Sequence, residues 1–210
     1  GAGLNSPSGE ITLPWNDFEA LYKKYVTEQQ PKIISPRDWT LDRAVFAGRV
    51  VGEGDDAYAI VKLSLSGQVH KKEGWATVPL LGASTALRSA KVGGKAQTGA
   101  DANLFVKDGY YTLITDKPGT FSAELEFAVK LFSADGETGF TLPLPSAGAT
   151  VVGVAVNSPE ALDFAVPGAQ GMSVTSVGNE RRVEAYIPSM SSLTVSWSRE
   201  IVEEDQKKRE

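Results

Sequence analysis

Two glutamates with a fixed spacing are the arrangement in this sequence that best fits acid–base catalysis. Glu124 and Glu126 are two positions apart in a segment of alternating polarity. On a strand, such neighbours share one face and lie about 7 Å apart, within the roughly 5–9.5 Å that separates the carboxyl groups of glycosidases. The chain has 26 acidic residues, so such pairs also arise by chance. A solvated strand face is the simpler explanation, and we predict no catalytic residues.

Histidine and cysteine chemistry is limited by how few of these residues the chain has. His70 is the single histidine, and there is no cysteine. A Ser-His-Asp triad would have to use His70, but this residue lies in the polar segment 68–74, and no Gly-x-Ser-x-Gly motif accompanies it. Zinc sites with several histidine or cysteine ligands are excluded, as are disulfides and thiolate nucleophiles. We therefore predict that the chain is not an enzyme and carries no cofactor.

Two loops have the composition of ligand-binding loops without their spacing. Residues 91–95 are rich in glycine, but they lack the P-loop spacing and a following helical pattern, so we interpret them as a flexible loop. Glu53, Asp55 and Asp56 offer the hard oxygen ligands that Ca²⁺ prefers. They lack the alternating spacing of an EF-hand loop, and a polar hairpin turn explains them better. We predict no metal site.

Aromatic side chains are the better indication of a binding site. Trp75 follows a glycine where a strand is expected to begin, and Tyr110 and Tyr111 follow an Asp-Gly turn. Consecutive strand residues point to opposite faces, so at least one of the two tyrosines should be partly exposed. We predict Trp75, Tyr110 and Tyr111 as ligand-binding residues. We assign Trp197 to the core, because it lies on the apolar side of its segment.

Short segments of alternating polarity must position these side chains. From about residue 42 the hydrophobic period is two, as expected for strands with one wet face. In the clearest case, residues 121–131, apolar side chains alternate with polar ones such as Ser122 and Glu124. Turn motifs with Asp-Gly, Pro-Gly and Gly-Asn separate these segments. The pattern predicts a mostly β chain, an antiparallel β-sandwich of the Ig-like or jelly-roll-like kind.

One N-terminal amphipathic helix is expected before the strands, over residues 14–30. Asn16 and Glu19 have the spacing of a capping box. The apolar residues recur at helical spacing and form one stripe, which consists of Trp15, Phe18, Leu21, Tyr22 and Tyr25. We expect this stripe to pack on the sandwich, with an aromatic surface for a partner as the alternative.

The expected organisation is one β domain between two polar ends. Residues 1–13 are small, polar and flexible, and residues 40–200 form the sandwich, with two Ig-like halves divided near residue 116 as an alternative. Residues 201–210 are a charged tail or a linker. No segment has the ~20 consecutive apolar residues of a membrane-spanning helix, although an anchor beyond residue 210 is compatible with the sequence.

The net charge of −5 argues against one class of partner. An acidic chain repels the phosphate backbone, so we predict no nucleic-acid binding. A protein or a glycan is the kind of partner that the aromatic residues fit.

The segment 11–21, with Gly74-Trp75 and Val78-Pro79-Leu80, resembles the N-terminal region of large uncharacterised bacterial cell-envelope proteins that contain β-sandwich modules. The resemblance implies an exported protein, periplasmic or in the cell envelope, whose signal peptide has been removed. It also implies a non-catalytic structural or protein-interaction module. A carbohydrate-binding module that uses exposed aromatics is the first alternative, and a glycan-active enzyme that uses a carboxylate pair is the second.

Overall fold

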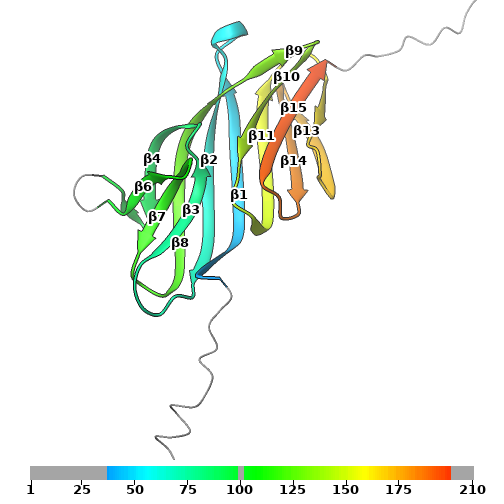
Figure 1. The fold of residues 1–210 in the computed structure, drawn as a ribbon. Helices are drawn as coiled ribbons and strands as arrows, with labels where there is room; N and C mark the ends of the chain where they lie inside the picture. Colours follow the sequence, from blue (N-terminus) through cyan, green and yellow to red (C-terminus); the bar gives the residue numbers. More distant parts are fainter. Residues whose placement is uncertain (1–36, 99–101, 200–210) are drawn as a thin grey trace, which may run out of the picture. The chain divides into compact units, whose positions relative to one another are not determined.

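The structure of the chain is a computed structural model that describes residues 37–98 and 102–199 (Figure 1). All described residues belong to one unit of the chain, residues 36–210. The predicted helix over residues 14–30, the N-terminus 1–13 and the charged tail 201–210 therefore lie outside the described residues.

The described residues form strands joined by short turns, with one turn of 3-10 helix, η1 (Gly54–Asp56). They contain no α-helix, and thus no helix that is long and apolar enough to cross a membrane. The strands are β1 (Trp39–Val51), β2 (Tyr58–Val69), β3 (Ala76–Gly82), β4 (Ala86–Val92), β5 (Lys95–Ala96), β6 (Leu104–Lys107), β7 (Tyr110–Thr115), β8 (Gly119–Lys130), β9 (Phe132–Ala134), β10 (Glu137–Pro143), β11 (Ala147–Asn157), β12 (Leu162–Ala165), β13 (Gly171–Val177), β14 (Glu180–Ile187) and β15 (Ser192–Arg199).

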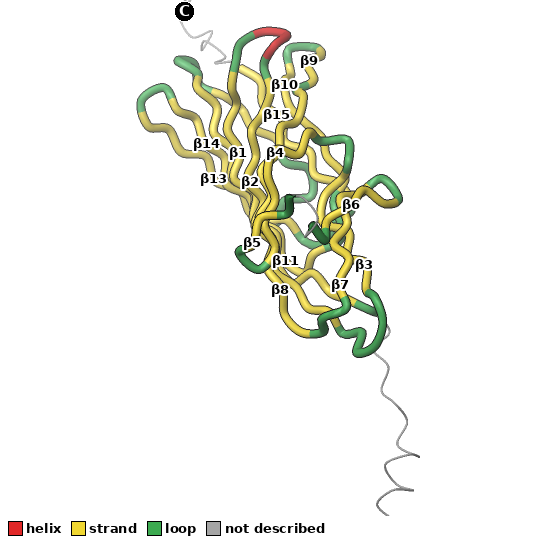
Figure 2. Tube along the Cα trace, turned by 90° about the vertical axis from the view of Figure 1, so that its left-hand side faces the viewer, coloured by secondary structure: helices red, strands yellow, loops and turns green. Residues whose placement is uncertain are grey.

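Three sheets make up the sandwich (Figure 2). The large sheet has eight strands in the order β13-β14-β11-β1-β2-β8-β4-β5. The four-stranded sheet has the order β12-β15-β10-β9, and the three-stranded sheet the order β3-β7-β6. The prediction of a mostly β sandwich is confirmed. The large sheet takes strands from both sides of residue 116, so a division there would cut through this sheet.

One pair of strands departs from the antiparallel expectation. β1 and β11 pair in parallel, from Leu41 opposite Ala147 to Arg49 opposite Ala155. Parallel neighbours cannot be joined by a tight hairpin and need a long connection. Here the strands β2 to β10 form that connection. The alternation of polarity along β1 or β11 does not indicate that the two strands pair in parallel.

One face of the large sheet forms the core with the two smaller sheets. Along β8 the side chains of Ala123, Leu125, Phe127 and Val129 are buried, while those of residues between them are more exposed, as the alternation predicts. The buried residues of all three sheets belong to one hydrophobic cluster. The opposite face of the large sheet, called the outer face below, is open to solvent.

Tight turns fix the register of the hairpins. Asp108 and Gly109 both have positive φ, as do Asp135 and Gly136, which is the requirement of a type I′ turn. These turns confirm the Asp-Gly predictions. The prediction of a flexible loop at residues 91–95 is wrong, because Gly93 and Gly94 also have positive φ and join β4 to β5 in a two-residue hairpin.

Candidate functional site

The three aromatic residues predicted to bind a ligand do not form one surface. Trp75 precedes β3 and is 61% exposed. Ala76 pairs with Thr115 at one end of the β3–β7 ladder, and Gly82 pairs with Tyr110 at the other. Trp75 and Tyr110 therefore stand about 20 Å apart. A role for each of them in binding stays a prediction, but they cannot share one small ligand.

The two tyrosines are partly buried at the start of β7. The Tyr111 hydroxyl donates a hydrogen bond to the Thr85 carbonyl oxygen at 3.1 Å, and its ring packs against the core. This hydrogen bond and packing give Tyr111 a structural role. Trp75 is the member of the predicted set that presents most of its side chain to solvent.

The glutamate pair lies on the outer face of the large sheet. Glu126 is within 3.9 Å of the Lys62 amine and 3.8 Å of the Arg88 guanidinium. Glu124 lies opposite Lys91 in the β4–β8 ladder. Both glutamates line a shallow depression of about 360 Å³. Cations thus surround this pair, as on an ordinary charged strand face.

The histidine considered for a catalytic triad lies beside a threonine hydroxyl. The single histidine, His70, has its Nε2 atom 3.1 Å from the Thr40 hydroxyl oxygen. In the part of the chain that the structure describes, no group of three histidine, cysteine, aspartate or glutamate side chains could hold a metal ion.

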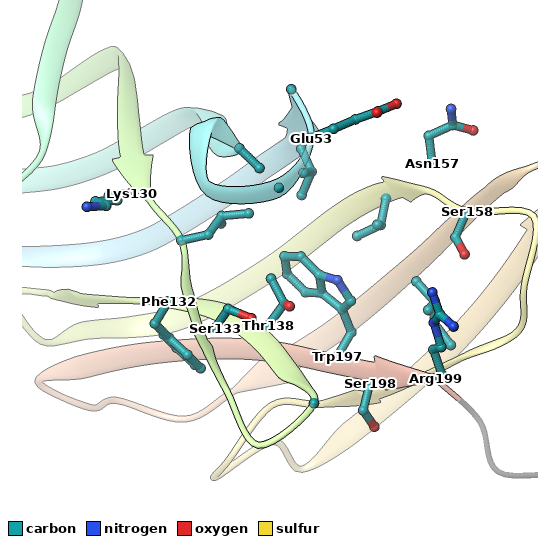
Figure 3. A pocket seen from close by; sticks show the side chains of 18 residues that line it. Glu53, Lys130, Phe132, Ser133, Thr138, Asn157, Ser158, Trp197, Ser198 and Arg199 are labelled. Carbon is teal, nitrogen blue, oxygen red and sulfur yellow. The ribbon is translucent and has the colours of Figure 1, made fainter.

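One concave site, here called the Trp197 cleft, has a volume of about 840 Å³ and is lined by residues of the large sheet and of the four-stranded sheet (Figure 3). β1 and β11 run parallel, and β2 lies antiparallel between β1 and β8. The C-terminal ends of β1, β8 and β11 therefore meet at one edge and form the first wall with the turn at η1. Strands β9, β10, β12 and β15 supply the second wall.

Trp197 forms the floor of the cleft. Its side chain is 7% exposed and lies with its ring centroid 6.2 Å from that of Phe164. In Figure 3 the indole rises between the two walls with its ring nitrogen on the side of Ser158. The other apolar side chains that line the cleft are those of Val50, Ala57, Leu131, Phe132, Val156 and Leu162.

The rim of the cleft is polar and carries charges of both signs. Glu53 extends from the turn after β1, and Lys130 ends β8. Arg199 ends β15, and its Nε atom lies 2.8 Å from a carboxylate oxygen of Glu160. Asn157 adds an exposed amide at the end of β11. The cleft thus offers donors and acceptors without one dominant charge.

A network around Arg181 holds the turn between β11 and β12 that carries Ser158 at the rim. The Arg181 guanidinium donates hydrogen bonds to three backbone carbonyl oxygens, those of Glu160 at 3.0 Å, Gly178 at 2.7 Å and Pro159 at 3.3 Å. The Ser158 amide also donates to the Asn179 carbonyl oxygen at 2.7 Å. Arg181 is therefore a positioning residue for this part of the rim.

Arg181→Met should lower the free energy of unfolding by about 1 kcal/mol. The three backbone carbonyl groups would lose their hydrogen bonds from the guanidinium and would bond to water instead, because they are exposed. Arg182→Met is the matched control. Its guanidinium reaches only the exposed Glu184 carboxylate at 3.2 Å, and such surface pairs contribute about 0–1 kcal/mol. Urea denaturation of both variants measures the difference. Equal losses would show that the network does not hold the turn.

The cleft was not predicted, although the burial of Trp197 was. The alternation in residues 193–197 correctly placed this side chain on the inner face of its strand. The sequence gives little indication of the cleft, because its polar rim residues come from segments far apart in the chain, namely Glu53, Lys130, Asn157 and Arg199. The pairing of β1 with β11 and with β8 through β2 brings the ends of three of these strands to one edge, and β15 of the four-stranded sheet adds Arg199.

Comparison with known proteins supports the fold. No protein-family model and no curated protein sequence matches the chain. A solved structure of a proposed nutrient binding protein from Legionella pneumophila has a TM-score of 0.55 at 11% identity, over 79% of this chain and 68% of that one. An M1 zinc metallopeptidase from Deinococcus radiodurans has a TM-score of 0.52 at 12% identity, over 79% of this chain and 43% of the peptidase. The chain thus spans less than half the length of that peptidase, and the similarity shows a shared fold.

Proposed function

We propose that this chain is a non-catalytic interaction module that binds an extended segment of a partner protein in the Trp197 cleft. The cleft is the observation that carries the proposal, with its volume of about 840 Å³, apolar floor and polar rim. Ligand sites are typically concave, mostly apolar, and roughly 300–1,000 Å³ in volume with a few polar groups. The proposed nutrient binding protein of similar fold offers a precedent for binding on such a scaffold.

The chemistry of the rim fits a polypeptide segment better than a charged small molecule. Glu53 and Lys130 have opposite charges, and Glu160 balances the charge of Arg199. Asn157 and Thr138 supply donors and acceptors, which the N–H and C=O groups of a peptide backbone require. An apolar side chain of the segment would then lie over Trp197.

The burial of Trp197 argues against a sugar at this position. A sugar ring stacks on an open aromatic face, but Trp197 is buried and packs against Phe164. Its accessible edge suits a hydrogen-bond acceptor and a small apolar group instead, because indole combines a donor with an apolar body.

This chain has too few histidine and cysteine residues to form a catalytic zinc site of the peptidase kind. Catalytic zinc is bound by three protein ligands, for example two histidines and a glutamate, and the whole chain has one histidine and no cysteine. The similarity to M1 peptidases therefore does not extend to a zinc site of this type made by the chain alone. This supports the proposal of a non-catalytic module.

The proposal can be tested with soluble libraries of short peptides, using the full chain and both thermal shift and tryptophan fluorescence. A peptide at 100 times its Kd should stabilise the chain by about 2.7 kcal/mol. Ser133→Tyr should weaken binding of the selected peptide at least about tenfold, because Ser133 is an exposed cleft residue and a tyrosine ring would occupy the space above the floor.

Ser122→Tyr is the matched control, since Ser122 is exposed on β8 and its neighbours in the large sheet place it on the outer face. Its affinity for the peptide should equal that of the unmodified chain. Failure of every peptide to bind, or an equal loss in the two variants, would contradict the proposal.

A carbohydrate site at Trp75 is the second candidate, because its side chain is the most exposed tryptophan among the described residues. The same screen with soluble oligosaccharides distinguishes the two sites. Sugar binding that is lost in Trp75→Ala and kept in Ser133→Tyr would favour this alternative. The location in the cell envelope stays a prediction.

A further inference from the structure

Strand β13 is an open edge of the large sheet. All of its seven residues are exposed, and it pairs on one side only, with β14. Its sequence Gly-Met-Ser-Val-Thr-Ser-Val contains no charge and no proline, and no charged residue occurs between Asp163 and Glu180. The register with β14 has no bulge from Gly171 to Val177. Such edges are templates for pairing with another chain.

The other edge strands of the described sheets carry features that block such pairing. β5 has two residues and contains Lys95, and β9 has three residues. β6 and β12 have four residues each and contain Lys107 and Asp163. β3 contains Pro79 and a register shift beside it. Shortness, charge, proline and bulges are the usual protections of an edge, and β13 has none of them.

The backbone groups that β13 leaves free follow from its hairpin with β14. Gly178 has positive φ, and the two-residue turn joins Val177 to Glu180. The flanking pair of such a turn exchanges hydrogen bonds, and bonded pairs then alternate along an antiparallel ladder. Val177, Thr175 and Ser173 therefore bond to β14. The N–H and C=O groups of Met172, Val174 and Ser176 point to the open side.

We propose that β13 pairs with β13 of a second copy of this chain, antiparallel about a two-fold axis at Val174. In this register Val174 lies opposite the partner's Val174, and Met172 lies opposite the partner's Ser176. Every outward N–H then meets an outward C=O, so the three N–H groups from each copy form six hydrogen bonds. An isologous contact of this kind closes both edges.

The side chains fit a second copy without a charge conflict. Val174, 44% exposed, faces the same side as the buried Val183 and would cover its counterpart. On the outer face, Thr175 lies beside the partner's Ser173, so the side chains that meet there are small, polar and uncharged. The nearest charged residues of this row, Arg182 and Glu184, pair with each other within each copy at 3.2 Å. An unrelated extended peptide would find the same backbone groups but no such symmetric match.

Sedimentation equilibrium of the full chain tests the proposal. The unmodified chain should show a monomer–dimer equilibrium at protein concentrations up to about 1 mM. Val174→Lys should weaken dimerisation about 100-fold or more, because two lysines would lie opposite each other. Val106→Lys is the matched control, since Val106 is 63% exposed on the edge strand β6, and its dimerisation should be unchanged. Circular dichroism checks that both variants fold.

The register is tested by disulfides, which the natural chain cannot form because it has no cysteine. Val174→Cys should cross-link to itself on oxidation, since bonded antiparallel pairs have Cα atoms about 5.5 Å apart, a separation usual for disulfides. Met172→Cys should cross-link only when mixed with Ser176→Cys. A monomer at all concentrations, an unaffected Val174→Lys dimer, or self-linking of Met172→Cys would overturn the proposal.

Discussion

Phe127→Ala should lower the free energy of unfolding by about 3–5 kcal/mol. Phe127 is fully buried on β8, opposite Val61 of β2 and Leu87 of β4. Replacement by alanine removes the whole phenyl ring from the middle of the large sheet, where backbone pairing on both sides prevents the strands from closing the cavity. The loss is therefore the transfer free energy of the ring plus the cost of the empty space. Urea denaturation, followed by circular dichroism, measures it.

Phe105→Ala is the control for the effect of losing a phenylalanine. Phe105 is exposed on the edge strand β6, so its replacement should change the unfolding free energy by less than about 1 kcal/mol. If the two variants lose similar amounts of unfolding free energy, the core does not centre on β8. A changed denaturant slope in Phe127→Ala would instead indicate an altered denatured state.

Gly139→Ala should destabilise the chain by about 3 kcal/mol, although it adds only one methyl group. A Cβ atom at Gly139 would clash with the Val195 carbonyl oxygen and would lie 2.8 Å from the Cα atom of Ser196. Both obstacles belong to β15, which is paired with β10 at this point, so no flexible side chain can move aside. The strands would have to separate next to Trp197, and the tryptophan fluorescence should shift together with the loss of stability.

Gly171→Ala tests whether any glycine in a strand would behave in this way. No atom lies within 4 Å of the position that its Cβ would take. Its stability should therefore stay within about 0.5 kcal/mol of the unmodified chain, or rise slightly, since alanine restricts the unfolded chain. A comparable loss in both variants would assign the effect to backbone propensity and not to close approach.

The local alternation of apolar and polar residues predicted the strands well, because burial of one face of a sheet places an apolar residue at every second position. Residues 121–131 match β8 within two residues at its start, and the predicted turn at Asp108-Gly109 joins β6 to β7. The assignment of Trp197 to the core is confirmed for the same reason. Gly93-Gly94 was misjudged because glycine permits both a loose loop and the positive φ angles of a tight hairpin.

Pairing between distant segments could not be predicted, because alternation says which face is buried and not which strand lies alongside. The parallel partner of β1 is more than a hundred residues away along the chain. The separation of Trp75 from Tyr110 depends equally on the β3–β7 register. The Trp197 cleft depends on strand pairing in the large sheet and on the four-stranded sheet opposite it, so the candidate site became visible only in three dimensions.

The parallel pairing of β1 with β11 also has a consequence for how the chain folds during synthesis. β1 ends at Val51, and its second neighbour is complete only when Asn157 has been made. Until then one side of a central, apolar strand has no partner. Closing such a long loop is entropically slow, and high contact order delays folding while exposing nascent strands to aggregation. A nascent chain that ends before β11 therefore exposes an unpaired side of β1, which is the kind of surface that chaperones cover.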